Sequence, residues 1–322
     1  MENKKISTLI TESKDHSVHG TEIYKKLGQV FLWQELDENG QEEAMNEANI
    51  LVIGLSLMID KHLIDKMPNL KVIATQTTGL NHIDVKYAEE KGIKIISLRG
   101  YTDFLQTITS TAEHAWGMTL SLLRNIPWAF EHVKNNGWDR LLWRGHELKG
   151  KTLGIVGLGR LGKMLAKYGN AFGMDVISTD PKLSEEEMKK FGAKKVDLDT
   201  LIKTSDIVTL HVLLNDDVYN LIKETHLKSM KPTAYFINTA RAELVEKDAL
   251  YNALKNKWIA GAAIDVLWDE KPDGSHLKND PLWEYAKINS NLIISPHIGG
   301  AAFEAMYATQ EFIAGLVVKN FA

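Results

Sequence analysis

Residues 152–180 read TLGIVGLGRLGKMLAKYGNAFGMDVISTD, and this stretch decides the fold of the second half of the chain. A short apolar run, Thr152–Val156, leads into the glycine pattern Gly157–Gly162. A second apolar run follows from Asp175 and ends at the acid Asp180. Between them, apolar residues recur at helical spacing, at Leu161, Met164, Leu165, Tyr168 and Phe172. The order strand, glycine turn, helix, strand and acid predicts a βαβ unit that binds a dinucleotide.

Each glycine of the pattern has its own predicted role. Gly157 allows the tight turn, Gly159 lets the backbone approach a diphosphate, and Gly162 lets the helix pack closely on the strand. The helix that opens at Arg160 and Leu161 offers unpaired N–H groups and a partial positive charge to the diphosphate. Asp180 follows 23 residues after Gly157, where its carboxylate can accept hydrogen bonds from a ribose diol. Its charge would repel a 2′-phosphate, so we expect NAD rather than NADP.

Composition narrows the class of protein. The 322 residues suit two domains, and the 44% hydrophobic and 25% charged content is typical of a soluble globular protein. A net charge of −4 with no long basic run argues against a nucleic-acid partner. The absence of cysteine excludes disulfides and thiolate metal sites, and no apolar run reaches the length of a secretion signal or a membrane span. We expect a cytoplasmic protein with no metal.

Short β-rich runs alternate with helical patterns along most of the chain, which predicts an α/β fold with parallel sheets in two doubly wound units. The stretch Asp269–Lys278 is rich in charge, contains Pro272 and Gly274, and is expected to be a loop. The final helical pattern, Ala302–Phe321, is compatible with packing on either unit. The expected strands are Ile50–Leu55, Leu70–Thr75, Ile93–Ser97, Ile207–Val212, Ala234–Asn238, Ala260–Val266 and Leu292–Ser295, with a helix over Asp84–Lys91.

Three polar residues follow strands of the second unit, and their types make a chemical set. Arg241, Glu270 and His297 each come after an apolar run. Ligands of open parallel sheets bind beyond the carboxyl ends of the strands, so all three side chains could face the dinucleotide. An arginine fork holds a carboxylate, a histidine passes a proton near neutral pH, and a carboxylate beside it orients the ring. Together with a hydride donor, they predict reduction of a 2-oxo acid.

These motifs resemble those of the D-isomer-specific 2-hydroxyacid dehydrogenase family, in particular its phosphoglycerate dehydrogenase-like branch. The resemblance covers about residues 50 to 320. The matching stretches are TGLNHID at Thr78–Asp84, AEH at Ala112–His114, LKGKTLGIVGLG at Leu148–Gly159, INTAR at Ile237–Arg241, AIDV at Ala263–Val266 and PHIGG at Pro296–Gly300.

The resemblance implies a role for each matching residue. Arg241 would bind the substrate carboxylate, His297 would be the acid and base, and Glu270 would pair with it. Asp265 would contact the nicotinamide carboxamide, and Thr239 and Ala240 would line the cofactor. The backbone N–H groups of Thr78, Gly79 and Leu80 would bind the substrate carboxylate.

The resemblance also implies a domain plan and a partner. Residues 1–108, completed by the C-terminal helix 300–322, would form a smaller flavodoxin-like substrate domain. Residues 109–299 would form the Rossmann NAD-binding domain. The substrate would be a small 2-hydroxy acid, phosphoglycerate-like or glycerate-like, and the protein a homodimer. Four tryptophans, Trp116, Trp128, Trp138 and Trp143, fit either that dimer interface or an aromatic core cluster.

The chain departs from the family pattern over Leu98–Thr111, which is longer than the family's loop at this place. Arg99 and Tyr101 could contact a distal group of the substrate or shape the hinge between the domains. His114 shows no metal-ligand spacing, and we interpret it as an ordinary histidine. Two other functions are compatible with the motifs: a formate or phosphite dehydrogenase on the same fold, and an NAD-sensing corepressor like the C-terminal-binding proteins.

Overall fold

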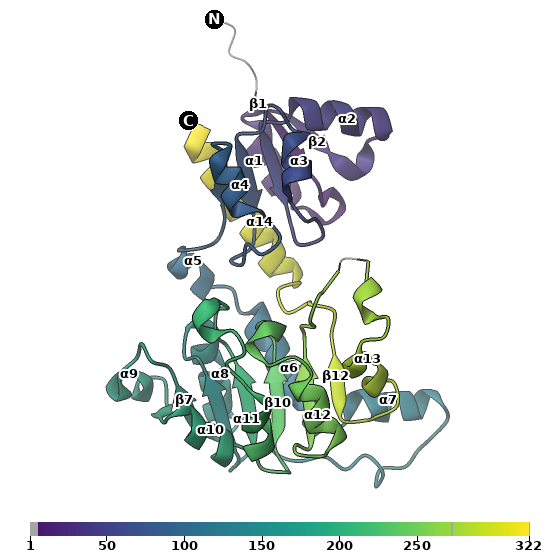
Figure 1. Cartoon of the computed structure of the whole chain (residues 1–322), viewed down its shortest axis with the longest axis vertical. Coiled ribbons are helices and arrows are strands. Elements are labelled where there is room, and N and C mark those ends of the chain that lie inside the picture. Colours follow the sequence, from purple (N-terminus) through teal and green to yellow (C-terminus); the bar gives the residue numbers. More distant parts are fainter. Residues whose placement is uncertain (1–5, 272, 322) are drawn as a thin grey trace, which may run out of the picture. The chain divides into compact units, whose positions relative to one another are not determined.

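The computed structural model describes residues 6–271 and 273–321, which form two compact α/β units (Figure 1). Unit 1 comprises the residues up to Ile108 together with those from Ala301 onward. Unit 2 comprises Thr109–Gly300. No helix in the described ranges has the length and apolar character needed to cross a membrane.

Unit 1 is built on a five-stranded parallel sheet in the order β2-β1-β3-β4-β5. This is the flavodoxin-like order of a doubly wound sheet. Buried residues form a separate apolar core on each face. The strands are β1 Ile6–Ile10, β2 Gly28–Leu32, β3 Ile50–Ile53, β4 Val72–Thr75 and β5 Lys94–Ile96. The helices are α1 Val18–Lys25, α2 Glu38–Glu47, α3 Lys61–Asp65, α4 Val85–Glu90, α5 Thr102–Gln106 and α14 Phe303–Phe321.

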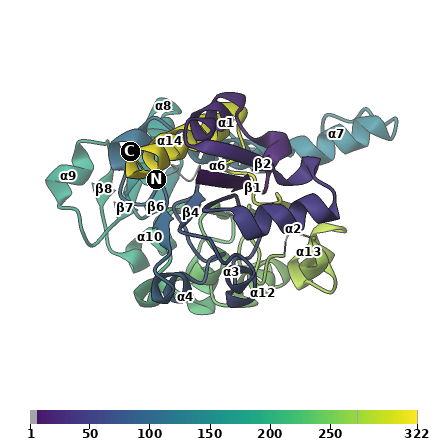
Figure 2. The ribbon, with the colours of Figure 1, turned by 90° about the horizontal axis from the view of Figure 1, so that it is seen from above.

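The C-terminal helix α14 belongs to unit 1, where it packs beside α1 (Figures 1 and 2). The backbone N–H of Ser17 donates to Gln310 Oε1 at 2.7 Å. The Ser17 hydroxyl donates to Glu311 Oε1 at 2.6 Å. Ile313, Ala314 and Val317 of α14 are buried in the core that includes Ile50 and Val52 of β3. The last helix therefore completes the apolar core of the first sheet.

Unit 2 is built on a seven-stranded parallel sheet in the order β12-β11-β10-β9-β6-β7-β8. The chain order reverses between β6 and β9, so a crevice opens there at the carboxyl ends of the strands. The strands are β6 Thr152–Val156, β7 Asp175–Thr179, β8 Lys194–Lys195, β9 Ile207–Leu210, β10 Tyr235–Asn238, β11 Gly261–Ile264 and β12 Leu292–Ile294. The helices are α6 Ser110–Leu123, α7 Ile126–Lys134, α8 Arg160–Ala171, α9 Glu185–Lys189, α10 Leu198–Thr204, α11 Glu224–Ser229, α12 Ala249–Lys255 and α13 Pro281–Ala286.

The prediction of two doubly wound parallel sheets is confirmed, but the segment expected as a loop over Leu98–Thr111 is partly helical. It contains α5 and the start of α6. Phe104 of α5 stacks on Phe312 of α14 with ring centroids 3.9 Å apart, and Tyr101 meets the same ring edge-on at 5.1 Å. The apolar contact with α14 stabilises a helix that the local sequence did not indicate. In the expected loop Asp269–Lys278, residues Ser275–Leu277 form a short 3₁₀ helix, and Pro272 lies outside the described residues.

The four tryptophans do not form one cluster. Trp116 is buried in the core of unit 2 and contacts Tyr168 and Phe172. Trp138, in contrast, is 91% exposed. The core interpretation therefore fits Trp116 and does not fit Trp138.

Candidate active site

The glycine turn between β6 and α8 has the geometry that a diphosphate requires. Gly157 has φ of 90°, and a Cβ there would lie 2.8 Å from the carbonyl oxygen of His211. A Cβ on Gly162 would lie 2.1 Å from the carbonyl oxygen of Gly157, so only glycine lets α8 approach the turn. A Cβ on Gly159 would meet no atom within 4 Å, so this glycine faces open space. The N-terminus of α8, at Arg160 and Leu161, is thus accessible to an anion.

Asp180, directly after β7, lies against the same turn. Its Oδ2 accepts the backbone N–H of Leu158 at 3.0 Å, and its Oδ1 accepts that of Lys182 at 2.9 Å. The two bonds fix the carboxylate beside the glycines and leave lone pairs on both oxygens. This is the place that a ribose diol would occupy if the diphosphate bound at Gly159.

The turn after β10 brings Thr239, Ala240 and Arg241 to the carboxyl edge of the sheet. Asn238 shapes this turn: its Nδ2 donates to the carbonyl of Arg241 at 2.9 Å, and its Oδ1 accepts the N–H of Ala240 at 3.0 Å. The buried hydroxyl of Thr239 has no hydrogen-bond partner within the described residues. A buried polar atom without a partner costs free energy, so a cofactor that bonds to it fits this position.

Arg241 is half-buried at the end of the same turn, and one of its guanidinium nitrogens donates to the carbonyl of Ala240 at 2.7 Å. This bond uses one of five guanidinium donors. The remaining donors can bind a carboxylate in a fork, which is the recognition expected of this residue.

His297 and Glu270 form a close pair. His297 Nδ1 and Glu270 Oε2 are 2.6 Å apart, and the two side chains are 30% and 32% exposed. The other carboxylate oxygen, Oε1, accepts the backbone N–H of Leu267 at 2.7 Å, which fixes the carboxylate. Because Nδ1 is engaged, Nε2 of His297 is the ring atom that can exchange a proton with a substrate. The pairing expected for these two residues is thus present in the geometry.

Asp265 is buried, at 1% exposure, and both of its oxygens bond to protein groups. Oδ1 accepts the Ser295 hydroxyl at 2.5 Å and the Ile298 N–H at 2.9 Å, and Oδ2 accepts the Gly299 N–H at 2.7 Å. Burial raises the pKa of Asp265, but hydrogen bonds from His114, Ser295, Ile298 and Gly299 outweigh it and leave the pKa below its ordinary value. Asp265 is therefore an ionised carboxylate that holds the residues after His297.

Sequence reasoning missed the contacts of His114, which was considered only as a possible metal ligand. His114 Nε2 lies 2.9 Å from Ser295 Oγ and 3.3 Å from Asp265 Oδ1. The AEH motif marked this position, but 181 residues separate His114 from Ser295, and no local pattern indicates such a contact.

Thr78, Gly79 and Leu80 lie in unit 1, directly after β4 and Thr77. Within the described residues, no hydrogen bond uses the backbone N–H of any of the three. Thr77 stabilises the turn, since its hydroxyl donates to the carbonyl of Gly79 at 2.7 Å. Three free N–H groups at the end of a strand are suited to an anionic ligand.

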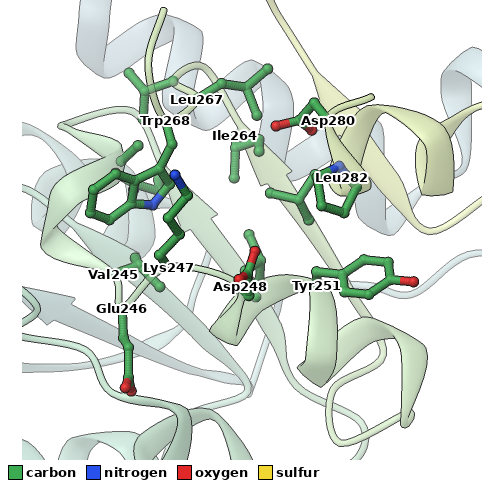
Figure 3. Close-up of a pocket in the computed structure, with 15 residues that line it drawn as sticks. Val245, Glu246, Lys247, Asp248, Tyr251, Ile264, Leu267, Trp268, Asp280 and Leu282 are labelled. Carbon is green, nitrogen blue, oxygen red and sulfur yellow. The ribbon is translucent and has the colours of Figure 1, made fainter. Parts of the chain in front are cut away.

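A small cavity in unit 2 is lined by chain neighbours of the site residues, among them Asn238, Ala242 and Leu267 (Figure 3). It is lined by Trp268, Lys247 and Tyr251, among others, and has a volume of about 60 Å³. None of the predicted site residues lines it. Sites for small ligands usually measure about 300–1,000 Å³, so this cavity is too small to hold a dinucleotide.

Comparison with known proteins indicates the family of this chain. Residues 116–299 match the family model described as "D-isomer specific 2-hydroxyacid dehydrogenase, NAD binding domain". A glyoxylate reductase of Thermococcus litoralis is 37% identical over 313 residues, which cover 94% of this chain and 89% of the relative.

Solved structures of similar proteins span nearly the whole chain. A D-lactate dehydrogenase of Aquifex aeolicus, in complex with NAD and lactic acid, superposes with a TM-score of 0.78 at 29% identity, covering 98% of this chain and 95% of that one. A phosphoglycerate oxidoreductase of Vibrio cholerae superposes with a TM-score of 0.77 at 27% identity, covering 98% of each chain.

Proposed function

Because the chain belongs to the D-isomer-specific 2-hydroxyacid dehydrogenase family, we propose that Arg241, Glu270 and His297 catalyse reduction of a small 2-oxo acid to its 2-hydroxy acid. Membership makes the chain an NAD-dependent oxidoreductase that acts on the CH–OH group of donors. The observation that carries the residue assignment is the 2.6 Å contact between His297 and Glu270. It lies at the sheet edge where Arg241 and the glycine turn also lie, because all the strands are parallel.

The residues present fit the cofactor. Gly159 leaves open space at the N-terminus of α8, and the Thr239 hydroxyl lacks a partner among the described residues. Gly157, Gly162, Arg160, Leu161 and Asp180 would hold the diphosphate and ribose, and Thr239 and Ala240 would line the nicotinamide end. When bound, the nicotinamide supplies the hydride.

The protein's own groups would perform the remaining steps. The guanidinium of Arg241 binds the substrate carboxylate and draws electron density from the neighbouring carbonyl. His297 Nε2 gives its proton to the oxygen of the forming alcohol, and takes it back in the reverse direction. Glu270 keeps the ring oriented and compensates its positive charge. The N–H groups of Thr78, Gly79 and Leu80 would bind the same carboxylate from the substrate domain.

The substrate is a small 2-oxo acid, with hydroxypyruvate, phosphohydroxypyruvate, glyoxylate and pyruvate as the compounds to compare. A relative named glyoxylate reductase and a similar structure that holds lactic acid support this class. The test is NADH oxidation followed by its absorbance over that panel, with His297→Ala as the inactive control. Turnover of at least one acid that disappears in His297→Ala supports the proposal. No turnover of any 2-oxo acid by the wild type would contradict it.

We also propose that the protein is a homodimer through α7 and the segment after it. Large apolar side chains are exposed on α7 and beyond it: Ile126, Phe130, Val133, Trp138, Leu141 and Leu142. An exposed apolar patch of this kind marks an interaction surface. Light scattering coupled to gel filtration tests the mass: the wild type should be a dimer, and Phe130→Glu combined with Trp138→Glu should give a monomer. A monomeric wild type would contradict the proposal.

A further inference from the structure

We propose that His114 is a positioning residue for catalysis, which acts through Ser295 and Asp265 to hold the turn that carries His297. The inference deepens the proposed function and rests on it, because it concerns the placement of the proposed acid and base. Figure 1 shows α6, which bears His114, in unit 2 together with β12, which leads into that turn.

The His297 turn needs an external restraint. His297 has φ of 55°, a left-handed conformation that is unfavourable for a residue with a side chain. Within the turn, the N–H of His297 donates to the carbonyl of Ser295 at 3.0 Å. The next two N–H groups, those of Ile298 and Gly299, both donate to Asp265. The carboxylate therefore holds the backbone directly after His297.

The hydrogen-bond directions place His114 at the start of this network. The Ser295 hydroxyl carries one proton, and at 2.5 Å from the Asp265 carboxylate that proton forms a charge-assisted bond. Ser295 therefore accepts from His114, and His114 Nε2 carries the donated proton. The shorter contacts run from His114 to Ser295 to Asp265, and each bond polarises the next; the same His114 Nε2 also lies 3.3 Å from Asp265 Oδ1.

Packing reinforces the same arrangement. A Cβ on Gly299 would lie 3.0 Å from Asp265 Oδ2, 3.2 Å from Thr111 Cγ2 and 3.7 Å from His114 Cδ2. The turn thus lies directly against the first turns of α6, with little space for a side chain. Unit 2 begins at Thr109 and ends at Gly300, so the network joins the first and last segments of the unit.

Substitutions at His114 separate the hydrogen bond from packing. His114→Phe keeps an aromatic ring and removes the donor, whereas His114→Gln keeps a side-chain N–H. Displacing a catalytic group by about 1 Å can cost a hundredfold in rate, so we expect His114→Phe to lower kcat about tenfold to a hundredfold. The Kd for NADH should stay within about threefold of the wild type, because the glycine turn is unchanged. Ser295→Ala should lower kcat to a similar extent.

The matched control is His146→Phe, at an exposed histidine of the same unit. It should keep the wild-type kcat, and His114→Gln should recover most of the activity that His114→Phe loses. Wild-type kcat in His114→Phe, or equal losses in His114→Gln and His114→Phe, would overturn the proposal.

The NMR signal of the His297 ring can be measured without enzymatic turnover, so it tests the role of His114 separately from the proposed function. In protein labelled with ¹³C at the histidine rings, the His297 signal is assigned by its loss in His297→Gln. The proposal predicts that His114→Phe changes the chemical shift of the His297 ring, and that His146→Phe does not. An unchanged His297 signal in His114→Phe overturns the positioning role, whether or not the wild type reduces any acid of the panel.

Discussion

Replacing Gly159 with alanine should separate cofactor binding from folding. The new Cβ would meet no protein atom within 4 Å, and the backbone at Gly159, with φ of −71° and ψ of −155°, is open to alanine. Alanine is a poorer N-cap than glycine, which costs up to about 1 kcal/mol. For a unit of this size, that lowers the melting temperature of the free protein by only about 2–4 °C.

The same methyl group would occupy the space through which the diphosphate approaches the N–H groups of α8. Losing one hydrogen bond to a charged phosphate costs about 1.5–3 kcal/mol, which raises the Kd for NADH roughly 10- to 150-fold. Fluorescence titration with NADH measures the Kd, and differential scanning calorimetry measures the melting temperature of the free protein.

Two other glycines provide the controls. Gly162→Ala places a Cβ 2.1 Å from the carbonyl oxygen of Gly157, so it should lower stability by about 1–3 kcal/mol even without cofactor. Gly117→Ala, in open space on α6, should add up to about 1 kcal/mol of helix stability and leave the Kd unchanged. If Gly159→Ala binds NADH as the wild type does, the diphosphate does not bind at this turn.

Three further predictions concern the site and the fold. Arg241→Lys keeps the charge but loses the planar fork, so kcat/KM should fall at least about tenfold to a hundredfold with little change in NADH binding, and near-normal kinetics would remove Arg241 from the substrate site. The wild type should prefer NAD to NADP in kcat/KM, and Asp180→Ala should narrow that preference; equal use of both cofactors by the wild type would contradict the role of Asp180. Burial lowers the pKa of His211 to about 4, and its Nδ1 is shielded and unpartnered within the described residues. The unfolded chain then binds more protons than the folded one below the ordinary pKa of 6.5, so His211 should cost up to about 2 kcal/mol of stability at pH 5 and almost nothing at pH 7.5. Urea unfolding measures the free energy of unfolding at both pH values. Between pH 7.5 and pH 5 this free energy should fall less in His211→Gln than in the wild type. An equal fall in both proteins would mean that His211 is protonated in the folded state.

The βαβ unit could be predicted from sequence because its determinants are local. The tight turn at Gly157 and the close packing at Gly162 depend on residues within one strand, turn and helix. Parallel strands present their carboxyl ends at one edge of the sheet. Because Arg241, Glu270 and His297 each follow a strand, the sequence also predicted that all three lie at that edge.

The helix α5 could not be predicted in this way. Its apolar side chains are stabilised by Phe312 of α14, which lies at the other end of the chain. In the linear sequence, Tyr101 and Phe104 stand in a polar stretch with no helical period of its own. The membership of α14 in unit 1 is of the same kind, since contacts such as that between Ser17 and Gln310 decide it.

The sequence by itself determined which residues make up the candidate site and at which edge of the sheet they lie, because strand direction and glycine geometry are local properties. The tertiary structure decided the hydrogen bonds that orient them. Glu270 divides its two oxygens between Leu267 and His297, and Asp265 holds the turn after His297 while His114 reaches it from α6. The contact of His114 with Ser295 joins segments 181 residues apart, and a hydrogen bond depends on tenths of an ångström that only the packed chain fixes.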